Sequence, residues 1–79
     1  MTNDQIFGTT NAITKTAAMM TKMAGEAVSV EYIGGAYYAF GSEIATLRLF
    51  HSYNKAAHNP KASAGFSENL KKFYFRLEV

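Results

Sequence analysis

Apolar and polar positions in residues 11–24 recur with the period of an α-helix. At about 100° per residue, one broad arc holds most of the apolar side chains of this segment together with Thr16, and its apolar members are Ile13, Ala17, Met19, Met20, Met23 and Ala24. Lys15 and Lys22 fall on the opposite side. Thr9 and its polar neighbours offer N-caps, and Gly25 supplies the left-handed position that commonly ends a helix. We therefore predict an amphipathic helix over residues 11–24.

The pattern then changes to the alternation of a β-hairpin. Residues 27–33 alternate and are rich in β-branched and aromatic side chains, and residues 36–40 continue the pattern after two glycines. With the glycines as the turn, the opposite pairs are Ile33–Ala36, Tyr32–Tyr37, Glu31–Tyr38, Val30–Ala39 and Ser29–Phe40. One face is then apolar and consists of Val28, Val30, Tyr32, Tyr37 and Ala39. The other face is mixed and holds Ser29, Glu31, Tyr38 and Phe40.

Two interpretations compete for residues 43–53. In the first, Ser42 caps a helix whose first turn carries Glu43, and good helix formers follow. An apolar flank of that helix is formed by Ile44, Leu47, Phe50 and Tyr53. In the second, the segment is a meander strand with one face made of Ala45, Leu47 and Leu49. We favour the helix.

The C-terminal third of the chain is predicted to be a loop followed by a strand. Residues 54–66 show no periodicity and are rich in loop-forming residue types. Residues 71–79 alternate, with an inward set of Phe73, Phe75, Leu77 and Val79 and an outward set of Lys72, Tyr74, Arg76 and Glu78. A helical face made of Leu70, Phe73, Tyr74 and Leu77 is the alternative for this last segment.

These elements predict one small α+β domain over residues 1–79, in the order αββαβ. Three antiparallel strands form its sheet, and two helices cover one face of that sheet. Residues 1–8 are expected to be a frayed end, and residues 54–66 the long loop. The predicted core includes Val30, Leu47, Phe73 and Phe75.

The size and composition of the chain point to self-association. A domain of 79 residues buries a small core, and the absence of cysteine excludes disulfides and thiolate zinc sites as extra support. A methionine stripe, which consists of Met19, Met20 and Met23, lies on the first predicted helix. It either packs in the core or contacts a second copy. We predict a homo-oligomer.

The chain lacks the side-chain sets of common catalytic and metal sites. No Cys nucleophile and no Gly-x-Ser-x-Gly elbow is present. His51 and His58 are seven positions apart and have no carboxylate between them, which leaves a metal site short of ligands. The glycines at 34 and 35 precede a strand pattern and carry no phosphate-binding signature. We expect no enzymatic activity, no metal site and no cofactor.

Charge and hydropathy favour a protein of the cytoplasm that does not enter a membrane. No segment approaches the roughly 18 apolar residues of a membrane helix, and residues 1–10 lack a positively charged leader. The formal net charge is +2, and residues 46–79 hold six of the eight Lys and Arg. Six cations in that segment fall well below the density of a dedicated nucleic-acid arm.

The most informative candidate site is the sheet face turned away from the helices. If the last strand pairs with the hairpin, this face presents Tyr38, Phe40, Lys72, Tyr74 and Arg76. Aromatic side chains and arginine on an open sheet are typical of protein-interface hot spots, and also of sheets that stack single-stranded bases. We therefore expect these residues to bind a partner.

The expected function is that of a non-enzymatic protein-binding module. Such a chain acts by occupying a surface of a host protein, as inhibitors carried by phages or mobile elements do. Two alternatives stay open: a single-stranded nucleic-acid-binding sheet, and an oligomer that sequesters a small molecule between its subunits. Salt dependence distinguishes nucleic-acid binding, which weakens steeply as salt rises, from an apolar protein contact.

Overall fold

The computed structural model describes residues 6–57 and 61–79, and its first long element is helix α2 (Thr10–Ala24). The Thr9 hydroxyl accepts a hydrogen bond from the Ala12 N–H at 3.1 Å. At the other end, Gly25 has a φ of 77° and its N–H donates to the Thr21 carbonyl. The helix predicted for residues 11–24 is thereby confirmed, together with both of its end signals.

The predicted hairpin is confirmed in its register. Strands β1 (Ser29–Ile33) and β2 (Ala36–Gly41) pair antiparallel, from Ile33 opposite Ala36 to Ser29 opposite Phe40. Both turn glycines have positive φ, 56° at Gly34 and 83° at Gly35, as a type I′ turn requires. The turn chemistry therefore sets which side chains of the hairpin share a face.

Residues 43–57 form helix α3 (Glu43–Ala57), so the strand interpretation of residues 43–53 is wrong. Its N-terminus is capped by Ser42, whose hydroxyl accepts from the Ala45 N–H at 3.1 Å. The buried face consists of Ala45, Thr46 and Leu49. Leu47 lies about 200° around the helix from Leu49 and is 43% exposed, so its assignment to the core is also wrong.

The sheet has four strands, whereas three were predicted. Residues expected to lie in the long loop form β3 (Ala62–Ser67), and the last strand is β4 (Lys72–Glu78). The strand order is β1-β2-β4-β3, all neighbours are antiparallel, and the element order becomes αββαββ. The segment Ala-Ser-Ala-Gly-Phe-Ser has weak strand preference, and its pairing with β4 compensates for this. Residues 58–60 of the predicted loop lie outside the described residues.

The C-terminal strand and its predicted faces are confirmed, which overturns the helical alternative for that segment. Phe75 is fully buried and its ring stacks on that of Tyr53, with centroids 5.3 Å apart. Val30 and Phe73 are half-buried, and Val30 packs against the core. The core itself consists of Met20, Ala24, Tyr37, Ala39, Ala45, Leu49, Ala62, Phe75 and Leu77.

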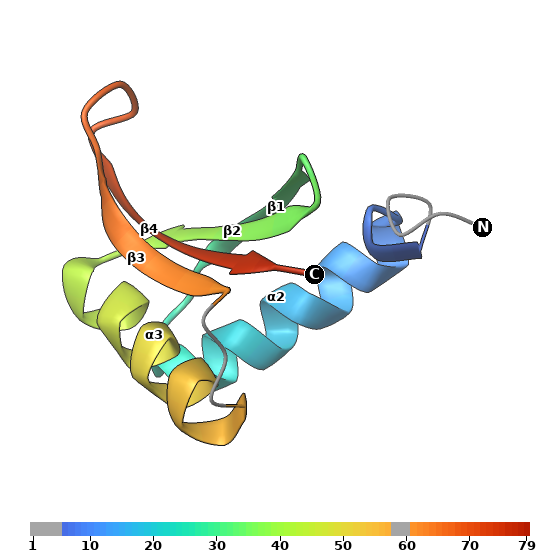
Figure 1. Ribbon diagram of the computed structural model, residues 1–79, viewed down its shortest axis with the longest axis horizontal. Coiled ribbons are helices and arrows are strands. Elements are labelled where there is room, and N and C mark those ends of the chain that lie inside the picture. The colour runs from blue at the N-terminus through green and yellow to red at the C-terminus, as the bar shows by residue number, and fades with distance from the viewer. Residues whose placement is uncertain (1–5, 58–60) are drawn as a thin grey trace.

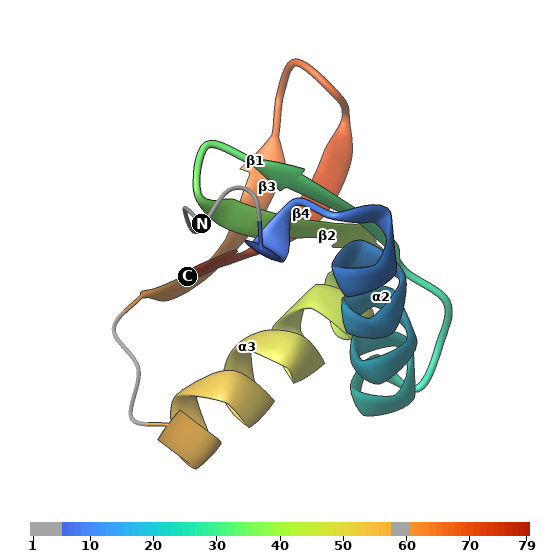
Figure 2. The same cartoon turned by 90° about the vertical axis from the view of Figure 1, so that its right-hand side faces the viewer.

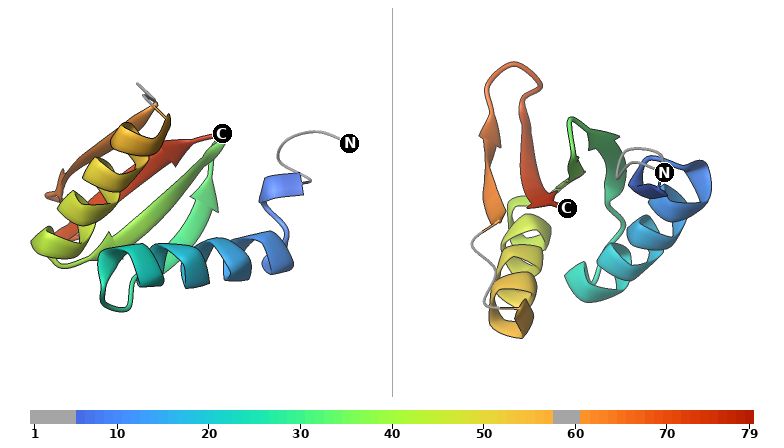
Figure 3. Two further views of the ribbon diagram at one scale, coloured as in Figure 1. Left: turned by 90° about the horizontal axis from the view of Figure 1, so that it is seen from below. Right: turned by 45° about the vertical axis from the view of Figure 1, so that its right-hand side comes forward.

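Both helices cover the same face of the sheet, as predicted (Figures 1 and 2). They approach each other where α2 ends and α3 begins (Figure 3). There the Arg48 guanidinium donates to the Ala24 carbonyl at 3.0 Å, which satisfies a C-terminal group of α2. Near the other end of α2, the Tyr37 hydroxyl donates to the Phe7 carbonyl at 2.8 Å. Part of the segment predicted to be frayed is thus held against the sheet.

Candidate binding face on the sheet

The outer face of the sheet points away from both helices (Figure 1). Pairing of β2 with β4 places Tyr38 opposite Arg76 and Phe40 opposite Tyr74. Lys72 belongs to the same face because side chains two positions apart in a strand point the same way. The structure therefore brings together all five residues that the sequence proposes as partner-binding: Tyr38, Phe40, Lys72, Tyr74 and Arg76. We refer to them as the outer-face cluster.

Three aromatic rings form the middle of the outer-face cluster. Tyr38 and Phe40 are nearly parallel, with an interplanar angle of 12° and centroids 6.3 Å apart. Tyr74 lies 6.2 Å from Tyr38 across the β2–β4 ladder. All three side chains are half-buried, so their neighbours restrict them while part of each stays open to solvent. Such rings are favourable anchors because they bring a large contact area and few rotatable bonds.

Two cations flank these rings. The Lys72 ammonium lies 5.9 Å from the centroid of Phe40, and the Arg76 guanidinium lies 5.8 Å from that of Tyr38. The Arg76 Nε also donates to the Tyr38 hydroxyl at 3.1 Å. This hydrogen bond raises the pKa of Arg76 above its ordinary value. Arg76 and Tyr38 therefore hold each other in one arrangement.

Carboxylates balance the charge of this face. Glu78 pairs with Arg76 at 3.6 Å, and Glu31 lies opposite Tyr38 on β1. Both glutamates belong to the outer face by the alternation of their strands. Together with Lys72, these groups give the face a formal charge near zero.

Gly65 is a residue of this face that sequence reasoning missed. It lies opposite Tyr74 on β3, and a Cβ built on Gly65 would come within 2.8 Å of the Tyr74 hydroxyl oxygen. The Tyr74 ring therefore rests against the backbone of β3, in space that only glycine leaves open. A glycine inside a strand is the available sequence signal for such a close approach, but residues 62–67 lack the sequence pattern of a strand.

The methionine stripe is divided by the fold. Met20 is fully buried in the core, Met23 is half-buried against it, and Met19 is 52% exposed. Met20 therefore follows the core-packing interpretation. Contact with a second copy through Met19 stays a prediction.

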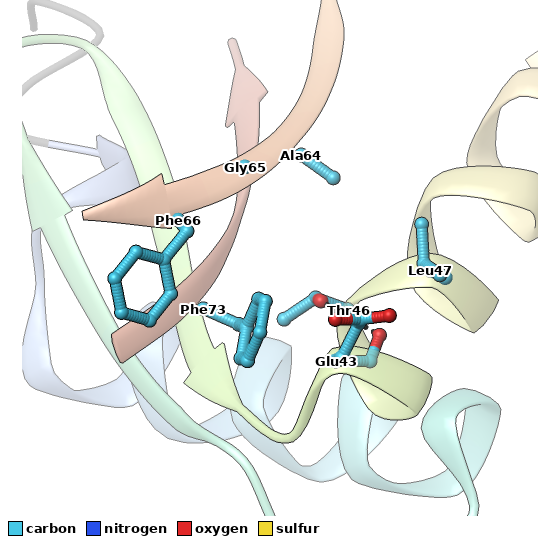
Figure 4. Close-up of a pocket in the computed structure, with 7 residues that line it drawn as sticks. All are labelled: Glu43, Thr46, Leu47, Ala64, Gly65, Phe66 and Phe73. Atoms are coloured by element: carbon cyan, nitrogen blue, oxygen red, sulfur yellow. Dashed lines mark hydrogen bonds between the residues drawn. The ribbon is translucent and has the colours of Figure 1, made fainter. Parts of the chain in front are cut away.

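An open cavity of about 230 Å³ lies between α3 and the β3–β4 hairpin, on the helix-covered side of the sheet. Its lining consists of Glu43, Thr46, Leu47, Ala64, Gly65, Phe66 and Phe73 (Figure 4). The cavity is mostly apolar and smaller than the usual pocket for a drug-sized ligand. The cavity could not be predicted from the sequence, because one of its walls is β3, which lies in the segment predicted to be a loop.

Within the described residues, no group of three or more His, Cys, Asp or Glu is placed to hold a metal ion. His51 is exposed on α3, where its ring lies edge-on to that of Phe50 at 5.9 Å. His58 lies outside the described residues. Neither α2 nor α3, the two long helices described, has the length and apolar content to cross a membrane.

No protein-family model matches the chain, and neither a curated protein nor a solved structure matches it.

Proposed function

We propose that the protein is a non-enzymatic binding module that contacts another protein through the outer-face cluster. The observation that supports this most is the convergence of three aromatic rings, an arginine and a lysine on one sheet face. Tyrosine and arginine are enriched among the residues that dominate the energy of protein interfaces.

The contacts within the cluster favour binding because they hold its side chains in place beforehand. The Tyr38 hydroxyl is bound by Arg76, and the Tyr74 ring is seated on Gly65. Immobilising a free side chain at an interface opposes association by about 0.5–1.5 kcal/mol. Side chains that are already ordered lose less of this entropy when a partner arrives.

The charge of the face favours a protein partner over a nucleic acid. Arg76 is paired with Glu78, and Glu31 lies on the same face. Affinity for a phosphate backbone depends on unneutralised Lys and Arg, and these carboxylates oppose it. Aromatic stacking of single-stranded bases is the second candidate, because the same rings are available for it.

In this proposal the protein acts by occupying a surface of its partner. A binding module of this kind inhibits a host protein when the covered surface is a functional one. An origin in a phage or a mobile element belongs to the same proposal, as does action in the cytoplasm.

The proposal is tested with the double variant Tyr38→Ala/Arg76→Ala. The matched control is Leu70→Ala, which truncates an exposed side chain between β3 and β4, outside the outer-face cluster. Each tagged protein is incubated with lysate of the native host, with and without nuclease treatment. Captured proteins are identified by mass spectrometry at low and moderate salt.

We expect one protein to be captured by the wild type and by Leu70→Ala and lost with the double variant, at both salt concentrations. Truncation of such anchors commonly weakens binding by about 2 kcal/mol or more. The thermal unfolding midpoint of the double variant should stay close to that of the wild type. Equal capture by the double variant would show that the outer face is not the contact site. Capture that is lost with nuclease or moderate salt would favour the nucleic-acid alternative.

A further inference from the structure

Strand β3 forms one edge of the sheet. The backbone N–H and C=O groups of every second β3 residue point away from the sheet. The Glu78 N–H donates to the Lys61 carbonyl at 3.2 Å, which shows that the polar groups of residue 61 face β4. Along an antiparallel ladder this direction alternates from residue to residue. The N–H and C=O groups of Ala62, Ala64 and Phe66 therefore point outward, where a further strand can pair with them.

This edge lacks the features that usually prevent pairing. Residues 62–67 contain no charged side chain and no proline. The opposite edge, β1, carries Glu31 at its centre, and two copies of β1 in full overlap would place two Glu31 carboxylates directly opposite each other. The two edges of the sheet thus differ, and β3 is the one that can pair with itself.

An apolar groove runs beside the open edge. It is the cavity between α3 and the β3–β4 hairpin, and Figure 4 shows Ala64 and Phe73 pointing into it. Leu47 on α3 and Phe66 on β3 are both 43% exposed at its borders. Large apolar side chains next to outward-pointing backbone groups are what an added strand would cover.

We propose that two copies of the chain associate through antiparallel pairing of their β3 strands. A two-fold axis that relates two such strands is perpendicular to the sheet and lies midway between them, so one residue pairs with the same residue of the second copy. The axis at Ala64 makes the fullest use of the outward-pointing groups. It pairs Ala64 with the second copy's Ala64, and Ala62 with the second copy's Phe66.

Size and charge are self-complementary in this register. The large Phe66 side chain of each copy meets the small Ala62 of the other. Lys61 precedes the strand and Glu68 follows it, so antiparallel pairing brings the Lys61 end of one copy next to the Glu68 end of the other. The uncharged middle of the strand contributes no repulsion. These features are specific to a second copy of this chain and identify it as the occupant.

The dimer goes beyond the proposed function and leaves the outer face open. Residues of the outer-face cluster belong to β2 and β4, whereas the new contact is made by the free edge of β3 and by the groove beside α3. Pairing would join two sheets into one and place two outer-face clusters on the same side. It therefore links self-association to a surface other than the methionine stripe.

The test uses opposite charges at the two-fold axis. Ala64→Lys and Ala64→Glu each place two like charges against one another in a homodimer, whereas a mixture of the two variants pairs Lys with Glu. The Ala64 side chain lines an open cavity, so a longer side chain has space there. Molar mass is measured by light scattering over a range of protein concentrations for the wild type, for each variant and for their mixture.

We expect a dimer of the 8.7 kDa chain for the wild type, a dissociation constant raised about tenfold or more for each variant, and a restored dimer on mixing. Circular dichroism confirms that each variant folds. Ala64→Pro is a second disrupting variant. The Ala64 N–H points to the open edge and makes no hydrogen bond to β4, so proline removes a hydrogen bond of the dimer and none of the β3–β4 ladder.

A wild-type monomer at the highest concentration, or dimers that persist in all three variants, would overturn the proposal. A mixture that stays monomeric would overturn the pairing at Ala64. Tyr38→Ala/Arg76→Ala should still dimerise, so failure of this inference is distinguishable from failure of the outer face as a binding site.

Discussion

Single side chains decide how the outer face is ordered, and Gly65 has the clearest effect among them. The Tyr74 ring occupies the position that a Cβ at residue 65 would need. A strand residue without a side chain is usually unfavourable. Here the loss is offset because an aromatic ring from the neighbouring strand covers the gap.

Replacement of this glycine tests the arrangement. We predict that Gly65→Ala forces the Tyr74 ring away from β3 and lowers the free energy of unfolding by about 1 kcal/mol. The aromatic NMR signals of Tyr74 should shift, and affinity for the partner should fall. The matched control is Ser63→Ala, because Ser63 is the preceding β3 residue on the outer face of the sheet. It should change neither the Tyr74 signals nor the affinity for the partner. If the Tyr74 signals did not shift in Gly65→Ala, the proposed contact between the Tyr74 ring and the Gly65 backbone would be contradicted.

Tyr53 carries a buried hydroxyl that has no hydrogen-bond partner among the described residues. An unsatisfied buried polar group destabilises a fold by about 1–3 kcal/mol. We predict that Tyr53→Phe keeps the stacking on Phe75 and raises the free energy of unfolding by roughly 1 kcal/mol, measured by chemical denaturation. Equal or lower stability would indicate that the hydroxyl is satisfied.

The same hydroxyl gives the stability a pH dependence. Burial raises the pKa of Tyr53 above its ordinary value of 10.0. The unfolded chain therefore loses this proton first as the pH rises. Ionisation of Tyr53 leaves the free energy of unfolding unchanged below pH 10 and lowers it as the pH rises above 10. We therefore expect the free energy of unfolding to fall less above pH 10 in Tyr53→Phe than in the wild type.

At the scale of elements, local signals define α2 and the hairpin, while long-range pairing defines β3. Thr9, Gly25 and the two turn glycines act on their own neighbourhood. The predicted helix bounds agree with the structure to one residue and the hairpin register agrees fully, although β1 begins at Ser29 and not at residue 27. Residues 62–67 carry no such signal and become a strand only beside β4. For the same reason the groove beside β3 and the contact of Tyr74 with Gly65 could not be predicted, although the outer-face cluster could.

The start of α3 offers a test of a local signal. The Ser42 hydroxyl accepts from the Ala45 N–H and donates to the Glu26 carboxylate, which connects the segment after α2 to α3. We predict that Ser42→Ala lowers the free energy of unfolding by about 1 kcal/mol, because it removes the cap of α3. Ser42→Thr keeps a hydroxyl and should retain most of the stability. If Ser42→Ala and Ser42→Thr had the same denaturation midpoint, a capping role of the hydroxyl would be contradicted.

At the scale of the whole molecule, the strand order places β4 at the centre. It pairs with β2 on one side and with β3 on the other, and its Phe75 and Leu77 contribute to the core. We predict that a fragment of residues 1–70 does not unfold cooperatively, although it contains both helices and the β1–β2 hairpin. Thermal denaturation followed by circular dichroism measures this. A sharp transition in the fragment would show that the first hairpin and the helices form an independent unit.

The central position of β4 also affects how the chain folds during its synthesis. While the ribosome elongates the chain, β2 and β3 each expose an edge until residues 72–78 emerge. The β1–β2 hairpin can pair earlier, whereas the native pairing of β2 and β3 with β4 waits until β4 has been made. Over that interval the uncharged β3 segment is open to contacts with other nascent chains, and chaperone binding at this stage would protect it.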